Sequence, residues 1–297
     1  MRRHVRLAIG WTAVAGAVSI ACFWAFWGGN EAFHEGWYSH SFWTNVALMM
    51  VQYLSPMVLF VVVAAASVRW RAIGVALHLG LAIFAFFFFH GGAGRYLIAL
   101  PLILLSACYW FGRPQPQRAA LWLVLVLPLL TAVVCGAGPA WRVAHRVDDG
   151  NYGARRIAGN GIELTWAPEG PGWPDSGANW FEAARACRDL DQDGLTAAAA
   201  PQDIWRLPTA NESVRSLVRD GRNAGGLLDP HAQMKARYQI QPDKETPLWN
   251  PHSMVIYWWT STEVNDKRAL EVSYNGWVNE RPKTAREGYL AYRCVRP

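Results

Sequence analysis

Apolar residues dominate the first half of the chain in five long runs, separated by short polar or charged segments. Each run approaches the roughly 20 residues that a helix needs to cross a hydrocarbon core of about 30 Å. We therefore expect an α-helical membrane bundle over residues 1–140, with the lipid bilayer as its partner. Pro56, Pro101 and Pro128 should kink their spans. The five predicted spans are residues 7–28, 44–68, 72–90, 96–112 and 119–138.

The pattern changes after residue 140, where apolar residues become short and alternating. Residues 141–160 are rich in Gly, Arg and Asp and are expected to form a tether. The segment 220–251 is rich in Gly and Pro, which predicts a long loop with at most short helical turns near 231–238. Asn275-Gly276 is a strong turn signal. The remaining periodicity predicts strands at 161–167, 255–260, 269–274 and 289–295 within a domain over 161–297.

One local motif is especially specific. Thr209 and Glu212 have the spacing of a capping box, in which each side chain satisfies the backbone N–H of the other residue. We expect a helix to begin at Ala210, with Val214 and Leu217 on its apolar face.

Charge is divided as sharply as hydropathy. Up to residue 140 there are eight Lys and Arg against only Glu31 and Glu35, whereas twenty residues of each sign follow. The net charge of +6 therefore belongs to the predicted membrane half. A nucleic-acid-binding domain would carry a basic stripe, so the balanced second half argues against nucleic acid as a partner.

The arginines also predict an orientation. Under the positive-inside rule, three clusters on one side of the bundle mark the cytoplasm. An odd number of spans then places the second half outside, in the periplasm of a Gram-negative-like bacterium. The competing interpretation, a cleavable signal peptide, is disfavoured because the first apolar run is too long. The clusters are Arg2, Arg3 and Arg6, then Arg69 and Arg71, then Arg113 and Arg118.

The order of motifs from about residue 150 to the end resembles the Lcl C-terminal domain, a bacterial domain with a C-type-lectin-like fold. The resemblance implies an α+β domain with a first helix over residues 180–190. The resemblance covers the second half only, and it indicates fold better than function, because such folds host many unrelated sites. The residues that carry it are Leu164–Ala167, Trp180 through Ala184 to Cys187 and Leu190, Trp205–Thr209, Tyr257–Thr262, Tyr274–Gly276 and Arg293–Arg296.

Cysteine usage agrees with an exported second half. Three cysteines lie in the predicted spans, which leaves Cys187 and Cys294 in the domain. In an oxidising compartment they can form a disulfide, and the lectin-like resemblance implies the same pairing. The bond would close a loop of about 107 residues, worth about 4–5 kcal/mol in the chain-entropy model. Two buried free thiols are the alternative.

Two segments contain candidate calcium ligands, the only cofactor that the sequence suggests. Asp189, Asp191 and Asp193, followed by Gly194, match the first positions of a calcium loop, although Ala200 stands where a bidentate Glu is expected. A solvated acidic turn is the alternative.

The second segment holds Gln241-Pro242-Asp243 and, further on, Trp249-Asn250. It resembles the calcium-dependent sugar site of C-type lectins, but Pro251 replaces the final Asp and Lys244 adjoins the triplet.

A binding surface without metal is also considered, because exposed aromatic side chains supply contact area at little entropic cost. In Tyr257-Trp258-Trp259, alternation sends Trp258 to one face of the strand and its two neighbours to the other, so at least one set packs in the core. The better candidates for exposed platforms are Trp249 and Trp277, flanked by Asn250 and Asn275.

The membrane half contains a polar cluster that could bind a metal or a proton. Its members share the outer side of the predicted bundle, where polar residues are also common for ordinary reasons. An alternative function follows from this cluster, namely a transport or metal-handling bundle regulated by the lectin-like domain. The members are Glu31, His34, Glu35 and His40 in the first outer loop and His90 at the end of the third span.

An enzymatic function has weaker support. Formylglycine-generating oxidases share the lectin-like fold and a similar Arg-Leu-Pro-Thr box, but their chemistry needs redox-active cysteines, and both domain cysteines are assigned to the disulfide. No Ser-His-Asp order, phosphate-binding loop or CxxC motif occurs in the second half. We therefore expect a non-enzymatic, membrane-anchored recognition protein with a glycan or peptide ligand.

Overall fold

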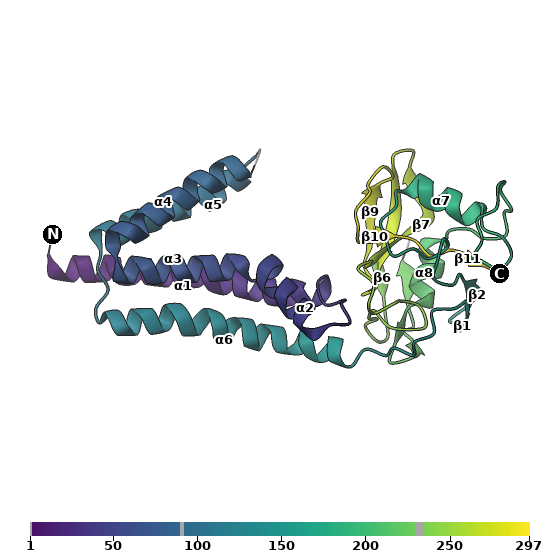
Figure 1. Ribbon diagram of the computed structural model, residues 1–297, viewed down its shortest axis with the longest axis horizontal. Helices are drawn as coiled ribbons and strands as arrows, with labels where there is room; N and C mark the ends of the chain where they lie inside the picture. Colours follow the sequence, from purple (N-terminus) through teal and green to yellow (C-terminus); the bar gives the residue numbers. More distant parts are fainter. Residues whose placement is uncertain (1, 90–91, 230–234) are drawn as a thin grey trace. The chain divides into compact units, whose positions relative to one another are not determined.

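The protein consists of two compact units. The computed structural model describes residues 2–89, 92–229 and 235–297. One unit comprises Met1–Trp37 and Ser41–Val143, and the other comprises Tyr38–His40 and Ala144–Pro297. The first is helical and the second contains the β-sheets (Figure 1).

The apolar runs of the sequence form the helices of the N-terminal unit. Four of these, α1, α4, α5 and α6, are long and apolar enough to cross a membrane, and the bent pair α2–η1 and α3 makes five if it counts as one span. A helical half with four or five candidate spans is thus confirmed for the described residues. The elements are α1 (Arg3–His34), α2 (Phe42–Leu48), the π-helix η1 (Met49–Tyr53), α3 (Ser55–Arg69), α4 (Arg71–Phe88), α5 (Gly94–Phe111) and α6 (Gln117–Ala144).

The second apolar run is broken rather than kinked. Its two halves, on either side of Leu54, are bent by 60°. Pro56 lies in the first turn of α3, where a proline fits a helix start but cannot donate a hydrogen bond to the preceding turn. Pro101 and Pro128, in contrast, stand inside helices α5 and α6.

Small residues of α1 pack against larger residues of the neighbouring helices in the interior of the N-terminal unit. In one core cluster, Ala13 and Ala17 of α1 pack with Leu105 of α5 and Val124 of α6. Small side chains allow helix backbones to approach closely, and α1 lies alongside α3 (Figure 1). The buried residues of α1 follow three- and four-residue spacing: Gly10, Ala13, Val14, Ala17, Ala21, Ala25, Gly28, Gly29 and Ala32.

The C-terminal unit is an α+β domain with a three-stranded sheet, β1-β2-β11, and a four-stranded sheet, β10-β7-β8-β9. Two further hairpins pair β3 with β4 and β5 with β6. All pairs are antiparallel except β10 with β7. The elements are β1 (Arg155–Gly159), β2 (Ile162–Trp166), α7 (Trp180–Arg188), α8 (Ala210–Ser216), β3 (Val218–Arg219), β4 (Arg222–Asn223), β5 (Leu227–Asp229), β6 (Lys235–Arg237), β7 (Tyr257–Asn265), β8 (Arg268–Ser273), β9 (Val278–Pro282), β10 (Leu290–Ala291) and β11 (Val295–Arg296).

Strand β7 carries a core on each of its faces. Trp258 packs in one cluster with Trp166 and Leu164, while Trp259 packs in the other with Trp205 and Cys187. Both tryptophans of β7 are therefore buried, at 1 % and 0 % exposure. The alternation along this strand is as expected, but neither tryptophan remains for a ligand.

The helix predicted after Thr209 begins where its capping box requires. Thr209 Oγ1 accepts a hydrogen bond from the Glu212 backbone N at 3.1 Å, and Glu212 Oε2 accepts one from the Thr209 N at 2.7 Å. Helix α7 has a second capping box, formed by Asn179 and Glu182. Both helix starts are thus stabilised by contacts three residues apart, which sequence patterns detect well.

Two predicted loop segments are structured instead. Residues 141–160, expected as a tether, contain the end of α6, a segment held to the domain by a hydrogen bond from the Thr246 N to the Val147 O at 3.1 Å, and strand β1. In the region 231–238, where helical turns were expected, Lys235–Arg237 form strand β6, and residues 231–234 lie outside the described part.

Candidate functional site

The two domain cysteines form the predicted disulfide. Cys187, in the last turn of α7, is bonded to Cys294, just before β11, with the Cα atoms 5.5 Å apart and a sequence separation of 107 residues. Both cysteines are fully buried. Cys22, Cys108 and Cys135, in the N-terminal helices, are free. The alternative of two free thiols in the domain is excluded.

Asp243 is a member of an internal ion cluster and not an open calcium ligand. Its Oδ1 accepts a hydrogen bond from Arg146 Nε at 2.9 Å, and its Oδ2 accepts one from Arg219 Nη1 at 2.7 Å. The Asp243 side chain is 7 % exposed. Two guanidinium groups therefore occupy the position where the predicted Ca²⁺ would bind, and their positive charge opposes a further cation. This contact corrects the predicted role of Asp243.

The neighbours of Asp243 extend this buried cluster. Burial lowers the pKa of Lys244, and nearby Arg146 lowers it further. The Lys244 Nζ donates to the Ser253 carbonyl oxygen. Burial raises the pKa of Glu245, whose Oε2 accepts a hydrogen bond from the Asp220 backbone N at 2.7 Å. Sequence reasoning missed these groups as a unit, because Arg146 and Asp243 are 97 residues apart and no local motif links them.

Trp249 and Asn250 are also placed differently from the prediction. The Trp249 ring is 1 % exposed and stacks on Trp258, with the ring centroids 3.7 Å apart. Asn250 Nδ2 donates to Glu169 Oε1 at 3.0 Å, and its Oδ1 accepts from the His252 backbone N at 2.7 Å. The expected exposed platform at Trp249 is therefore wrong, and Asn250 has a structural role in its turn.

The acidic segment after α7 forms a hydrogen-bonded turn. Asp193 Oδ1 accepts from the backbone N of Leu195 at 2.8 Å and of Thr196 at 2.9 Å, and these bonds lower the pKa of Asp193. Asp191 Oδ1 accepts from the Gln192 backbone N at 2.6 Å, while Asp189 caps α7. Among the described residues, these three carboxylates do not assemble into a group suited to a metal. The arrangement matches the alternative of a solvated acidic turn.

Trp277 is the predicted aromatic residue that the structure leaves exposed. It lies in the turn between β8 and β9, and its side chain is 66 % exposed. Its backbone N donates to Ser273 Oγ at 2.9 Å, and the Gly276 N donates to the Ser273 O at 2.9 Å. The expected turn at Asn275-Gly276 is thus confirmed.

The long loop supports this turn from the side. Tyr238 donates from its hydroxyl to the Gly276 O at 2.9 Å, and Gln241 Nε2 donates to the Asn275 O at 2.5 Å. Gly276 has φ of +88°, and a Cβ there would collide with the Tyr238 ring. Three predicted ligand-binding residues, Gln241, Asn275 and Trp277, are therefore brought together, with Trp277 presented on a braced turn.

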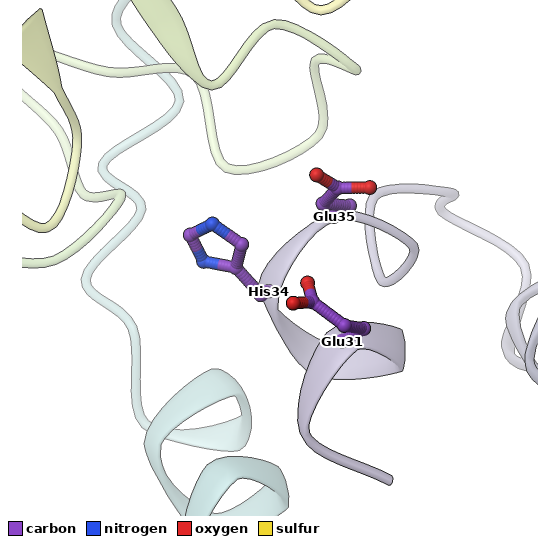
Figure 2. A group of neighbouring side chains, drawn as sticks. All are labelled: Glu31, His34 and Glu35. Carbon is purple, nitrogen blue, oxygen red and sulfur yellow. The ribbon is translucent and has the colours of Figure 1, made fainter. Parts of the chain in front are cut away.

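The polar cluster of the N-terminal unit is assembled in part. One potential ligand atom from each of Glu31, His34 and Glu35 lies within 4.8 Å of the other two. Figure 2 shows the three side chains leaving the same end of α1. This helix runs through Glu31 to His34, so the predicted loop begins later than expected. His40 belongs to a segment grouped with the other unit, and His90 lies outside the described residues.

Comparison with known proteins supplies no assignment. No family model, curated protein or solved structure matches this chain. The fold and the side-chain contacts are therefore the only grounds for a functional proposal.

Proposed function

We propose that this protein is a multi-pass protein of a bacterial inner membrane that presents a lectin-like recognition domain on the periplasmic side. The domain binds a glycan or a peptide through the surface around Trp277. The ligand contacts aromatic and amide groups directly and needs no calcium. The N-terminal unit anchors this domain in the bilayer, with the N-terminus in the cytoplasm.

The large apolar side chains exposed on the N-terminal helices support the membrane placement. Phe87, Leu97 and Trp122 are 68 %, 73 % and 68 % exposed. Large apolar side chains on an outer surface suit contact with lipid, because lipid tails are as apolar as these side chains and the contact carries no hydrophobic penalty. The Cys187–Cys294 disulfide supports an oxidising compartment for the domain. The arginine clusters, read by the positive-inside rule, support the same orientation.

The lectin-like assignment is supported by the local structure of the motifs that carry the resemblance. Residues 164–166 are in strand β2, the 180–187 segment is helix α7, and the Thr209 box begins helix α8. The Arg293–Arg296 ending supplies Cys294 to the disulfide and leads into β11. These elements occur in the order that the resemblance implies.

The single observation that carries the recognition proposal is the exposed ring of Trp277 on a turn held by Tyr238, Gln241 and Ser273. An exposed aromatic ring offers a large contact area, and a rigid support lowers the entropy lost on binding. Asn275 lies in the same turn, and the Gln241 side chain contacts that turn at the Asn275 backbone oxygen. Aromatic rings with neighbouring amides suit both sugar faces and peptide backbones.

A direct test applies the full-length protein in detergent to a glycan array and a peptide array, each with calcium and with a chelator. We expect saturable binding that the chelator leaves unchanged. The Trp277→Ala variant should weaken this binding by roughly 30-fold, corresponding to the loss of an aromatic contact worth about 2 kcal/mol.

Phe181→Ala is the matched control, because Phe181 is an aromatic residue on α7 that is 50 % exposed. It should bind as the wild type does. Equal losses in both variants would contradict the Trp277 surface. Binding to neither array would contradict recognition of these ligand classes, and dependence on calcium would contradict the metal-free mode.

A further inference from the structure

Two acidic residues, Glu31 and Glu35, lie at the C-terminal end of α1, where negative charge is least favourable in a helix. Glu31 and Glu35 are four residues apart, and like charges at this spacing repel each other across one turn. Helix α1 ends at His34, and the unpaired carbonyl groups of a helix C-terminus give it a partial negative charge that favours cations. Both carboxylates are therefore opposed by each other and by the helix.

One carboxylate oxygen of Glu31 lacks a hydrogen-bond partner among the described residues. This atom, Oε2, is also buried. An ionised oxygen shielded from water without a partner is costly. A cation held between Glu31, His34 and Glu35 would remove this cost and the repulsion between the two carboxylates together.

The geometry points to a binding site for one divalent transition-metal ion at Glu31, His34 and Glu35. The three ligand atoms lie within 4.8 Å of one another. Ligands bound at about 2.1 Å from one ion lie at most about 4.2 Å apart, so small side-chain rotations close the site. Figure 2 shows that the carboxylates and the imidazole extend from a single helical turn and its cap.

The ligand set selects the class of metal. Ca²⁺ and Mg²⁺ take oxygen ligands almost exclusively, whereas an imidazole nitrogen favours ions such as Zn²⁺, Co²⁺ or Fe²⁺. Three protein ligands leave at least one coordination position for water or another exchangeable group. The site is separate from the Trp277 surface, and its existence does not depend on the recognition function.

The test is a titration of the untagged full-length protein in detergent with Zn²⁺ by calorimetry and with Co²⁺ by visible absorption. We expect one ion per chain and a cobalt spectrum with a nitrogen ligand. His34→Gln and Glu35→Gln should each weaken binding by at least about tenfold, and Glu31→Gln should do the same. Circular dichroism and gel filtration establish that each variant is folded.

His4→Gln is the matched control, because His4 lies exposed at the opposite end of the same helix. It should bind Zn²⁺ as the wild type does. The proposal is overturned if the wild type binds no ion, or if His34→Gln and Glu35→Gln bind as tightly as His4→Gln. Should Glu31→Gln fail to fold, those two variants decide the question alone.

Discussion

The central helix of one unit and the core of the other unit bury different kinds of side chain. In the helical unit, the interior of α1 consists of glycine, alanine and one valine, while large residues such as Phe87 and Leu97 are exposed. In the C-terminal unit, five tryptophans are almost completely buried: Trp166, Trp205, Trp249, Trp258 and Trp259. Many large apolar side chains are therefore exposed in the helical unit, whereas the core of the C-terminal unit is built on buried tryptophans.

This contrast shows what drives packing in each half. In water, burying an aromatic side chain removes a large apolar area from the solvent and dominates stability. In a bilayer, the environment that we propose for the helical unit, that driving force is absent, so close backbone packing through small residues holds helices together. The C-terminal unit should thus depend on its core and its disulfide, and the N-terminal unit on its glycine contacts.

The largest expected effect concerns the disulfide. Cys187→Ser in the full chain should lower the stability of the C-terminal unit by about 4–5 kcal/mol, because the bond closes a loop of 107 residues. Thermal unfolding followed by near-ultraviolet circular dichroism measures this loss. Cys135→Ser, which removes a free cysteine of α6, is the control and should have little effect. Similar losses of stability in Cys187→Ser and Cys135→Ser would contradict the proposal that the disulfide stabilises the C-terminal unit in particular.

A smaller effect is expected at the glycine contacts of the helical unit. A Cβ at Gly10 would collide with the backbone of Arg113 and Pro114, whereas a Cβ at Gly80 has nothing within 4 Å. Gly10→Ala should destabilise the unit by about 1–3 kcal/mol through overpacking. Gly80→Ala should be neutral or stabilise α4 by about 0.5–1 kcal/mol, since alanine favours helices. Thermal aggregation in detergent, monitored by gel filtration, ranks the stability of the two variants. Equal aggregation temperatures for Gly10→Ala and Gly80→Ala would contradict close packing at Gly10.

The smallest effect is a pH dependence that belongs to the C-terminal unit. Burial raises the pKa of Glu212, but hydrogen bonds from Arg206 and Thr209 outweigh it, so the pKa lies below the ordinary 4.5. The folded state therefore binds this proton less readily than the unfolded state. The stability from Glu212 is present above pH 4.5 and is lost as pH falls through the lower folded value.

Glu212→Gln should accordingly flatten the loss of stability between about pH 5 and pH 3 and should cost about 1 kcal/mol at neutral pH, the usual value of a helix cap. Unfolding monitored by the fluorescence of the buried tryptophans, over this pH range and at neutral pH, measures the pH dependence of stability and the loss at neutral pH. Glu163→Gln, at an exposed pair with Arg156, is the control. An unchanged slope in Glu212→Gln would show that other carboxylates carry the acid sensitivity.

Local patterns were sufficient for much of the fold. The apolar runs predicted the helices, and the Thr209 box predicted the start of α8, because both depend on residues within a few positions of each other. Strand β1 was missed, although a signal was available: Asn160 and Gly161, with φ of 51° and 75°, form the two-residue turn that joins it to β2. The bend near Pro56 was predicted and is present, but the division of the second run into two helices, with Pro56 in the first turn of α3, was not predicted.

The sequence by itself determined the two-part organisation, the candidate spans, the capping box at Thr209 and the short turn that presents Trp277. Each of these follows from hydropathy or from hydrogen bonds between near neighbours. Only the tertiary structure decided that Trp249 stacks in the core while Trp277 is exposed, and that Asp243 pairs with Arg146 and Arg219. Arg219 and Arg146 are 24 and 97 residues away from Asp243, and Trp249 stacks on a residue of strand β7, which lies outside its own turn. No local pattern shows which of these segments will pack together.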